Sequence, residues 1–243
     1  MKRWVILVYG VLVYMVFILT MAYSIAFFGN IVVARTIDAA PTLPLGRGLF
    51  VNTVLMILFG LQHSGMARPG FKAWLTKGIP RVAERSTYVL MTCLALGWMF
   101  IAWQPMTGVV WQIEGAAALL MQLLFLAGAG LVLWATFMIS HTHLFGLAQA
   151  WQAFRGQSAA EADELIEPAM YKYSRHPMYL GILMVLWCTP TMSTGHLLMA
   201  AVWSVYVFIG IGYEERDLLD KFGDQYADYM RRVPQLLPIG RKA

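Results

Sequence analysis

The sequence contains few charged residues. Asp, Glu, Lys and Arg make up 13% of its 243 residues, whereas 59% are hydrophobic. Soluble domains carry about 25% charged residues, so this composition argues against a soluble protein and predicts several bilayer-spanning helices. The net charge is +5, but the basic residues are scattered through short loops. The positive-inside rule explains that pattern without a nucleic-acid partner.

Cysteine is also scarce, which bears on disulfides and metal sites. Cys93 and Cys188 both lie inside apolar runs, so we expect two small buried hydrophobic residues and neither a disulfide nor a metal pair. A cleavable signal peptide is not indicated either. The apolar stretch at 4–28 is too long for a signal-peptide core and lacks a clear cleavage site, which predicts a retained first span.

Apolar runs of about 20 residues, the length that crosses a bilayer, define the predicted fold. They occur at residues 4–28, 48–64, 87–104 and 115–140. A further block at 178–213 is too long for one span, and a tight turn from Pro190 to Gly195 is predicted to divide it. The result is a short helix at 178–190 and a long helix from 196 to 222. We therefore predict an all-α polytopic bundle of about six transmembrane helices that ends in a helical hairpin. No internal repeat or low-complexity segment is evident, so residues 1–243 are predicted to form one domain.

Charge alternates from one connection to the next. The 65–86 and 141–177 connections and the C-terminal tail are basic, whereas 105–114 and 191–195 contain no Lys or Arg. Basic loops remain in the cytoplasm, so this alternation predicts that both termini are cytoplasmic. Arg35 and Arg47, in the 29–47 loop, are exceptions to the pattern.

One polar run directly precedes the predicted short helix and carries groups suited to ligand binding. Its candidate residues are Tyr171, Tyr173, Arg175, His176, Pro177, Tyr179 and Gly181. Pro177 suits a first helical turn, and the free N–H groups of such a turn bind anions. Arg175 and His176 add donors, while Tyr179 and Gly181 would permit close packing of a ring-shaped ligand. A loop that Arg and Tyr merely anchor at the lipid headgroups would show the same residues.

A pair of adjacent acids, Glu214 and Glu215, is predicted to lie beside this run. The short helix rises about 20 Å, and the returning helix covers the same distance by about residue 209. Both acids should then lie level with Arg175 and His176. Adjacent acids at a membrane edge are costly unless they are paired. They could bind a ribose, an ammonium or a sulfonium, or form a structural salt bridge with Arg175 or Arg216.

These two blocks together resemble the C-terminal signature of integral-membrane methyltransferases, which include the isoprenylcysteine carboxyl and phospholipid methyltransferases. The matching motif is Arg175-His176-Pro177-x-Tyr179-x-Gly181, Glu214-Glu215-x-x-Leu218 and Phe222-Gly223-x-x-Tyr226-x-x-Tyr229-x-x-x-Val233-Pro234. In that family the Arg-His-Pro loop and the paired Glu bind S-adenosylmethionine, which implies that the cofactor-binding part spans 171–238. Membrane sterol reductases look similar here and bind NADPH, so the motif is also compatible with a reductase.

Blocks in the rest of the chain resemble the bacterial methanethiol S-methyltransferases. They are Gln62-His63-Ser64-x-Met66-Ala67-Arg68-Pro69, Glu84-Arg85-Ser86-Thr87-Tyr88 and Leu144-Phe145-Gly146-Leu147-x-Gln149. The resemblance implies S-adenosylmethionine-dependent methylation of methanethiol, a small thiol, to dimethyl sulfide in a bacterial inner membrane. A membrane family associated with nitrite and nitric-oxide reduction shares the first two blocks. A methyltransferase that acts on a lipid or prenylcysteine carboxylate, and a non-catalytic membrane subunit, are also compatible with the sequence, which leaves the oligomeric state open.

Thiol methylation requires a thiolate, because the thiolate is the nucleophile. A nearby imidazole or a positive field favours loss of the thiol proton. His63 and His141 are therefore the predicted base or orienting groups, Arg68 and Arg85 would lower the thiol pKa, and Tyr88 would form a wall of the substrate pocket.

Two further histidines are assigned no catalytic role. His141-x-His143 could form half of a metal site, but no Cys or acid at ligand spacing completes it, so no metal is predicted. His196 falls on the far side of the predicted topology, where we expect it to be interfacial.

Overall fold

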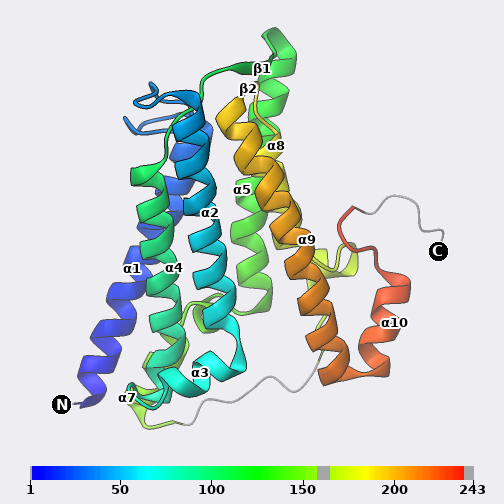
Figure 1. The fold of residues 1–243 in the computed structure, drawn as a ribbon. Helices are drawn as coiled ribbons and strands as arrows, with labels where there is room; N and C mark the ends of the chain where they lie inside the picture. The colour runs from blue at the N-terminus through cyan, green and yellow to red at the C-terminus, as the bar shows by residue number, and fades with distance from the viewer. Residues whose placement is uncertain (1, 158–164, 238–243) are drawn as a thin grey trace. The chain divides into compact units, whose positions relative to one another are not determined.

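The computed structural model describes residues 2–157 and 165–237, which form helices and one short β-ribbon (Figure 1). The elements in chain order are α1 (Lys2–Gly29), α2 (Leu45–Ala67), α3 (Pro69–Leu75), η1 (Arg81–Ala83), α4 (Glu84–Ala102), β1 (Val109–Gln112), α5 (Gly115–Ile139), α6 (His141–Leu144), α7 (Leu147–Arg155), η2 (Ala169–Lys172), α8 (Pro177–Trp187), β2 (Thr191–Ser193), α9 (Thr194–Phe222) and α10 (Asp224–Arg232). Pro238, Arg241 and Lys242, which belong to the predicted cofactor-binding part or the basic tail, lie outside the described residues.

Five of the described helices are long and apolar enough to cross a bilayer, which confirms the predicted all-α polytopic fold. They are α1, α2, α4 with η1, α5 and α9. The sixth predicted span is α8, a shorter apolar helix of 11 residues. The third span begins at Arg81, six residues before the predicted 87. Its first turns include Glu84, an acid that is favourable near a helix N-terminus. A search for apolar runs in the sequence leaves such a residue out.

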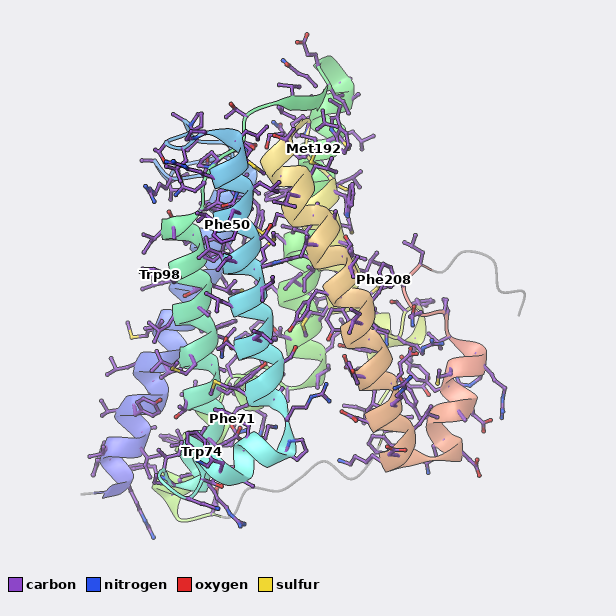
Figure 2. All side chains as sticks on the ribbon, viewed as in Figure 1. Phe50, Phe71, Trp74, Trp98, Met192 and Phe208 are labelled. Atoms are coloured by element: carbon purple, nitrogen blue, oxygen red, sulfur yellow. The ribbon has the colours of Figure 1, made fainter. Side chains whose placement is uncertain are left out.

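The outer faces of these helices carry large apolar side chains. Phe50, Trp98 and Phe208 project away from α2, α4 and α9 (Figure 2) and are 71%, 63% and 51% exposed. Soluble proteins rarely expose apolar surface on this scale. Contact with lipid accounts for it.

The chain forms two compact units, each built from separated segments. The first unit consists of Met1–Gly108 and Ser140–Ala160, and the second of Val109–Ile139 and Glu161–Ala243. In the first, α1 packs against α4 and α7, and α2 packs against α4. In the second, α5 packs along α8, and α9 contacts both α8 and α10. The single domain over 1–243 stays a prediction.

The chain reverses after Pro190, as predicted, but the turn contains strand β2 of a β-ribbon, which the sequence pattern did not indicate. β1 and β2 pair antiparallel, with Val109 opposite Ser193 and Gln112 opposite Thr191. Ser193 then caps α9, because its hydroxyl accepts the backbone N–H of His196 at 3.0 Å.

His196 lies in the first turn of α9, and its side chain is fully buried within the protein. Its predicted place at the membrane interface stays a prediction. Its Nε2 donates to the carbonyl oxygen of Leu186, 2.9 Å away at the end of α8. The ring therefore satisfies a carbonyl that the end of the short helix leaves without an intrahelical partner.

A glycine contact allows α5 and α8 to approach closely. A Cβ atom at Gly181 would lie 2.6 Å from the carbonyl oxygen of Gly128 and 2.9 Å from the amide nitrogen of Val132. These are backbone atoms, which cannot swing aside. The close packing at Gly181, which the sequence motif assigned to a ligand, is thus packing against helix α5.

We expect Gly181→Ala to lower the melting temperature of the purified protein. An extra methyl group in a tight contact costs about 1–3 kcal/mol, which outweighs the gain of about 1 kcal/mol in helix propensity. Gly130→Ala, on the open face of α5, is the matched control and should leave the melting temperature unchanged or raised. Equal melting temperatures for the two variants would contradict this account of the helix contact.

Candidate cofactor and thiol sites

The loop before α8 is held by the segment that follows α10. The backbone N–H of Arg175 donates to the carbonyl oxygen of Pro234 at 3.0 Å, and that of His176 donates to Gln235 at 3.2 Å. The chain reaches this position because it turns back at Gly223, whose φ of +55° favours glycine. Pro177 occupies the first position of α8, which confirms its predicted place.

The buried guanidinium of Arg175 joins three segments. Its Nε and one terminal nitrogen lie 2.9 and 2.8 Å from Oε1 of Glu215 on α9. The other terminal nitrogen donates to the carbonyl oxygens of Met230 and Val233 at 2.9 and 2.8 Å. Since a guanidinium has five N–H groups, protein acceptors engage four of them. Arg175 therefore organises the loop more than it offers donors to an anion.

The two adjacent acids reach the level of Arg175 and His176, as the helix arithmetic predicted. Oε1 of Glu215 also lies 3.0 Å from Nε2 of His176, and Glu215 is only 8% exposed. The side chain of Glu214 is 47% exposed and its Oε2 lies 3.8 Å from Nδ1 of His176. One acid is thus enclosed by Arg175 and His176, whereas the other faces outward beside them.

Aromatic residues surround this cluster. The ring of Tyr179 lies 5.6 Å from that of His176. Burial and the nearby Glu214 carboxylate raise the pKa of Tyr171, so its hydroxyl stays protonated. Tyr173 is 60% exposed.

Helix α10 contributes two tyrosines with different surroundings. The hydroxyl of Tyr229 donates to the carbonyl oxygen of Tyr171 at 2.6 Å, and Arg232 pairs with Glu167 at 2.8 Å. Tyr226 is 1% exposed, and its hydroxyl has no hydrogen-bond partner among the described residues. Burial and the charges of Glu215 and Glu214 raise its pKa to about 12, although Arg175 acts in the opposite sense.

In the first unit, three of the predicted catalytic residues come together. The hydroxyl of Tyr88 lies 3.0 Å from Nδ1 of His63, on the facing helix. The guanidinium of Arg85 lies over the ring of Tyr88, 5.3 Å from its centroid. Nε of Arg85 also donates to the carbonyl oxygen of Leu144 at 2.6 Å, which ties this group to the short helix α6.

His141 begins that same helix and is buried among aromatic rings. Its Nε2 lies 2.8 Å from the hydroxyl of Tyr14, and the ring of Phe145 packs edge-on at 5.0 Å. Burial lowers the pKa of His141, so its imidazole is neutral near pH 7. A neutral imidazole can accept a proton, as a general base must.

Arg68 lies between two helices. It is exposed and separates α2 from α3, as the C-cap of one and the N-cap of the other. Within residues 2–157 and 165–237, no three His, Cys, Asp or Glu side chains are grouped closely enough to hold a metal ion.

Comparison with known proteins shows which family the chain belongs to. The family model described as Phospholipid methyltransferase matches residues 119–225. Methanethiol S-methyltransferase of Mycobacterium tuberculosis is 43% identical over 98% of each chain. Methanethiol S-methyltransferase 2 of Bradyrhizobium diazoefficiens is 43% identical over 97% of this chain and 91% of its own. The chain belongs to the methanethiol S-methyltransferase family.

A further member of the family is also similar to the chain. Methanethiol S-methyltransferase of Pseudomonas deceptionensis is 44% identical over 88% of this chain and 82% of its own. No solved structure is significantly similar to the chain. The match to Phospholipid methyltransferase covers Arg175 and both acids but ends before Tyr226, whereas the methanethiol S-methyltransferases match almost the whole chain.

Sequence reasoning missed several residues that contact the two candidate groups. Tyr14, which pairs with His141, lies 127 positions away from it, and no motif links the two. Gln235 contacts both Glu215 and the loop, but it follows the family motif without being part of it. Tyr226 was visible within the motif, although nothing in the sequence indicated that its hydroxyl would be buried without a partner among the described residues.

Proposed function

We propose that this protein transfers the methyl group of S-adenosylmethionine to methanethiol, with dimethyl sulfide and S-adenosylhomocysteine as products. Membership of the methanethiol S-methyltransferase family supports the acceptor. The observation that carries the proposal is the cluster of Arg175, His176 and Glu215 with the outward-facing Glu214 beside it.

The chemistry of this cluster fits the methyl donor. S-adenosylmethionine carries an ammonium and a sulfonium, both cations, and a ribose diol that donates hydrogen bonds. Glu214 supplies a carboxylate whose side chain is 47% exposed, so it would hold one of these groups. Glu215 is already bound by Arg175 and His176, and it would keep the loop in place. The donor itself supplies the activated methyl group, so the protein's main task is to position the reactants.

The first unit offers groups that would take the thiol proton. The reaction requires that the thiol lose its proton as the C–S bond of the sulfonium breaks and a new bond forms to the thiolate sulfur. His63, in contact with Tyr88, and the neutral imidazole of His141 are the candidates. Arg85, over the ring of Tyr88, would supply the positive field that favours the thiolate.

We place the protein in the bacterial inner membrane with both termini in the cytoplasm. The apolar outer faces of the helices support a bilayer location, and the basic 65–86 connection supports the orientation. Methanethiol and dimethyl sulfide would partition through the bilayer, whereas the polar methyl donor would come from the cytoplasm.

The proposed reaction is tested by supplying purified protein with S-adenosylmethionine and measuring dimethyl sulfide in the headspace after methanethiol is added. Parallel reactions contain a bacterial lipid extract or a prenylcysteine in place of methanethiol. Dimethyl sulfide in the first reaction alone supports the proposal. Methylated lipid or prenylcysteine without dimethyl sulfide would overturn the choice of acceptor.

The base assignment predicts a change in pH dependence. We expect His63→Gln to reduce kcat/KM for methanethiol by about 10²–10⁴-fold near pH 7. The loss should shrink as the pH rises, because free thiols ionise above neutrality without assistance. His143→Gln, which makes the same substitution at another histidine, is the control. A variant with an unchanged pH profile would remove His63 as the base and leave His141.

A further inference from the structure

Gln235 hydrogen-bonds both halves of the proposed cofactor site. Its carbonyl oxygen accepts the N–H of His176 at 3.2 Å and the hydroxyl of Ser174 at 3.4 Å. Its side-chain Nε2 lies 3.4 Å from Oε2 of Glu215. The same residue therefore reaches the loop before α8 through its backbone and helix α9 through its side chain.

The two carboxylate oxygens of Glu215 have different hydrogen-bond partners, and Gln235 is the partner of one of them. Oε1 receives N–H groups from Arg175 and His176, whereas Oε2 receives only the amide of Gln235 within residues 2–157 and 165–237. If Oε2 had no hydrogen-bond donor, the buried carboxylate of Glu215 could rotate to turn that oxygen toward solvent. The amide of Gln235 gives Oε2 a partner while Oε1 stays hydrogen-bonded to Arg175 and His176.

The neutrality of the amide also suits its surroundings. The groups that face Glu215 are Arg175 and His176 from the loop, Glu214 from its own helix and Tyr226 from α10. Two carboxylates are already present. An amide donates a hydrogen bond without adding a third negative charge.

We propose that Gln235 is a positioning residue for methyl-donor binding: it fixes Glu215 against Arg175 and His176 and so leaves Glu214 to meet the donor. This inference rests on the proposed function for the identity of the donor. It extends the site beyond the family motif to the segment after α10.

The test is Gln235→Glu, which would place two carboxylates within hydrogen-bond distance. Like charges this close do not both ionise, so the pair would bind a proton that it must lose as the pH rises. The protonated pair restores the hydrogen bond. We therefore expect the Kd for S-adenosylmethionine to rise about tenfold or more at pH 8 relative to the unmodified protein and to return toward it at pH 6, as measured by calorimetry on purified protein in detergent.

Two controls make the result decisive. Gln235→Leu removes the donor without a charge, so its Kd should be raised equally at both pH values. Gln112→Glu makes the same substitution at an exposed position on β1, and its Kd should match that of the unmodified protein. A Gln235→Glu variant whose Kd is unchanged, or raised equally at both pH values, would overturn the inference.

The experiment also separates this inference from the proposed function. Binding of S-adenosylmethionine is measured without methanethiol, so a protein that binds the donor but makes no dimethyl sulfide overturns only the acceptor. If the unmodified protein binds no S-adenosylmethionine, the proposed donor is wrong. The melting temperature then tests the positioning of Glu215 alone. Relative to Gln112→Glu, the melting temperature of Gln235→Glu should be lower at pH 8 than at pH 6. An equal difference from Gln112→Glu at both pH values would overturn the inference.

Discussion

Replacing Glu215 with alanine is expected to lower the free energy of unfolding by about 3–5 kcal/mol, the usual cost of removing one partner from a buried ion pair. The guanidinium of Arg175 and the ring of His176 would remain buried without their shared acceptor. Because those contacts hold the loop before α8, donor binding should be lost as well. Thermal denaturation and donor titration of the purified variant measure the two effects.

Two comparisons distinguish this result from a general effect of substitution. Asp217→Ala, an exposed acid two positions further along α9, should leave the melting temperature unchanged. The double variant Arg175→Met, Glu215→Leu removes both charges, so it should recover part of the lost stability but none of the donor binding. A Glu215→Ala protein as stable as Asp217→Ala would contradict the buried ion pair.

Glu214→Gln is expected to show the opposite pattern, with an unchanged melting temperature and a Kd for S-adenosylmethionine raised about tenfold or more. The side chain of Glu214 is 47% exposed, and substitutions at such positions seldom change stability by more than about 0.5 kcal/mol. The loss of a charged hydrogen bond or ion pair to the donor accounts for the weaker binding.

The contrast between the two neighbouring acids is the useful readout. Glu214→Gln should reduce binding while the protein remains folded, whereas Glu215→Ala should affect both. If Glu214→Gln bound the donor as tightly as the unmodified protein, Glu214 would not be the ligand carboxylate. Both acids would then have to be regarded as structural.

The level of the two acids could be predicted from the sequence because it depends on a constant. An α-helix rises 1.5 Å per residue, and the reversal after Pro190 is short, so the position of Glu215 opposite Arg175 follows by arithmetic. The spans could be predicted for a similar reason, since apolar length alone decides whether a helix crosses a bilayer.

Contacts that depend on helix rotation or on distant chain reversals could not be predicted in this way. The pairing of Tyr14 with His141 requires the rotation of α1 about its axis, which an evenly apolar helix does not reveal. Gln235 reaches Glu215 only because the chain turns back at Gly223 and again after α10. Gly181 shows the same limit, because a glycine permits close approach without indicating what approaches, and here helix α5 does so.

The central claim is that this chain moves a methyl group from S-adenosylmethionine to methanethiol, and an isotope experiment tests it most directly. Purified protein is supplied with S-adenosylmethionine whose transferable methyl group is deuterated, together with unlabelled methanethiol, and the headspace is analysed by mass spectrometry. The account predicts dimethyl sulfide that carries one deuterated methyl group, and a much lower yield from Glu214→Gln at a subsaturating donor concentration. Unlabelled dimethyl sulfide, or deuterium found only in the lipid fraction, would contradict it.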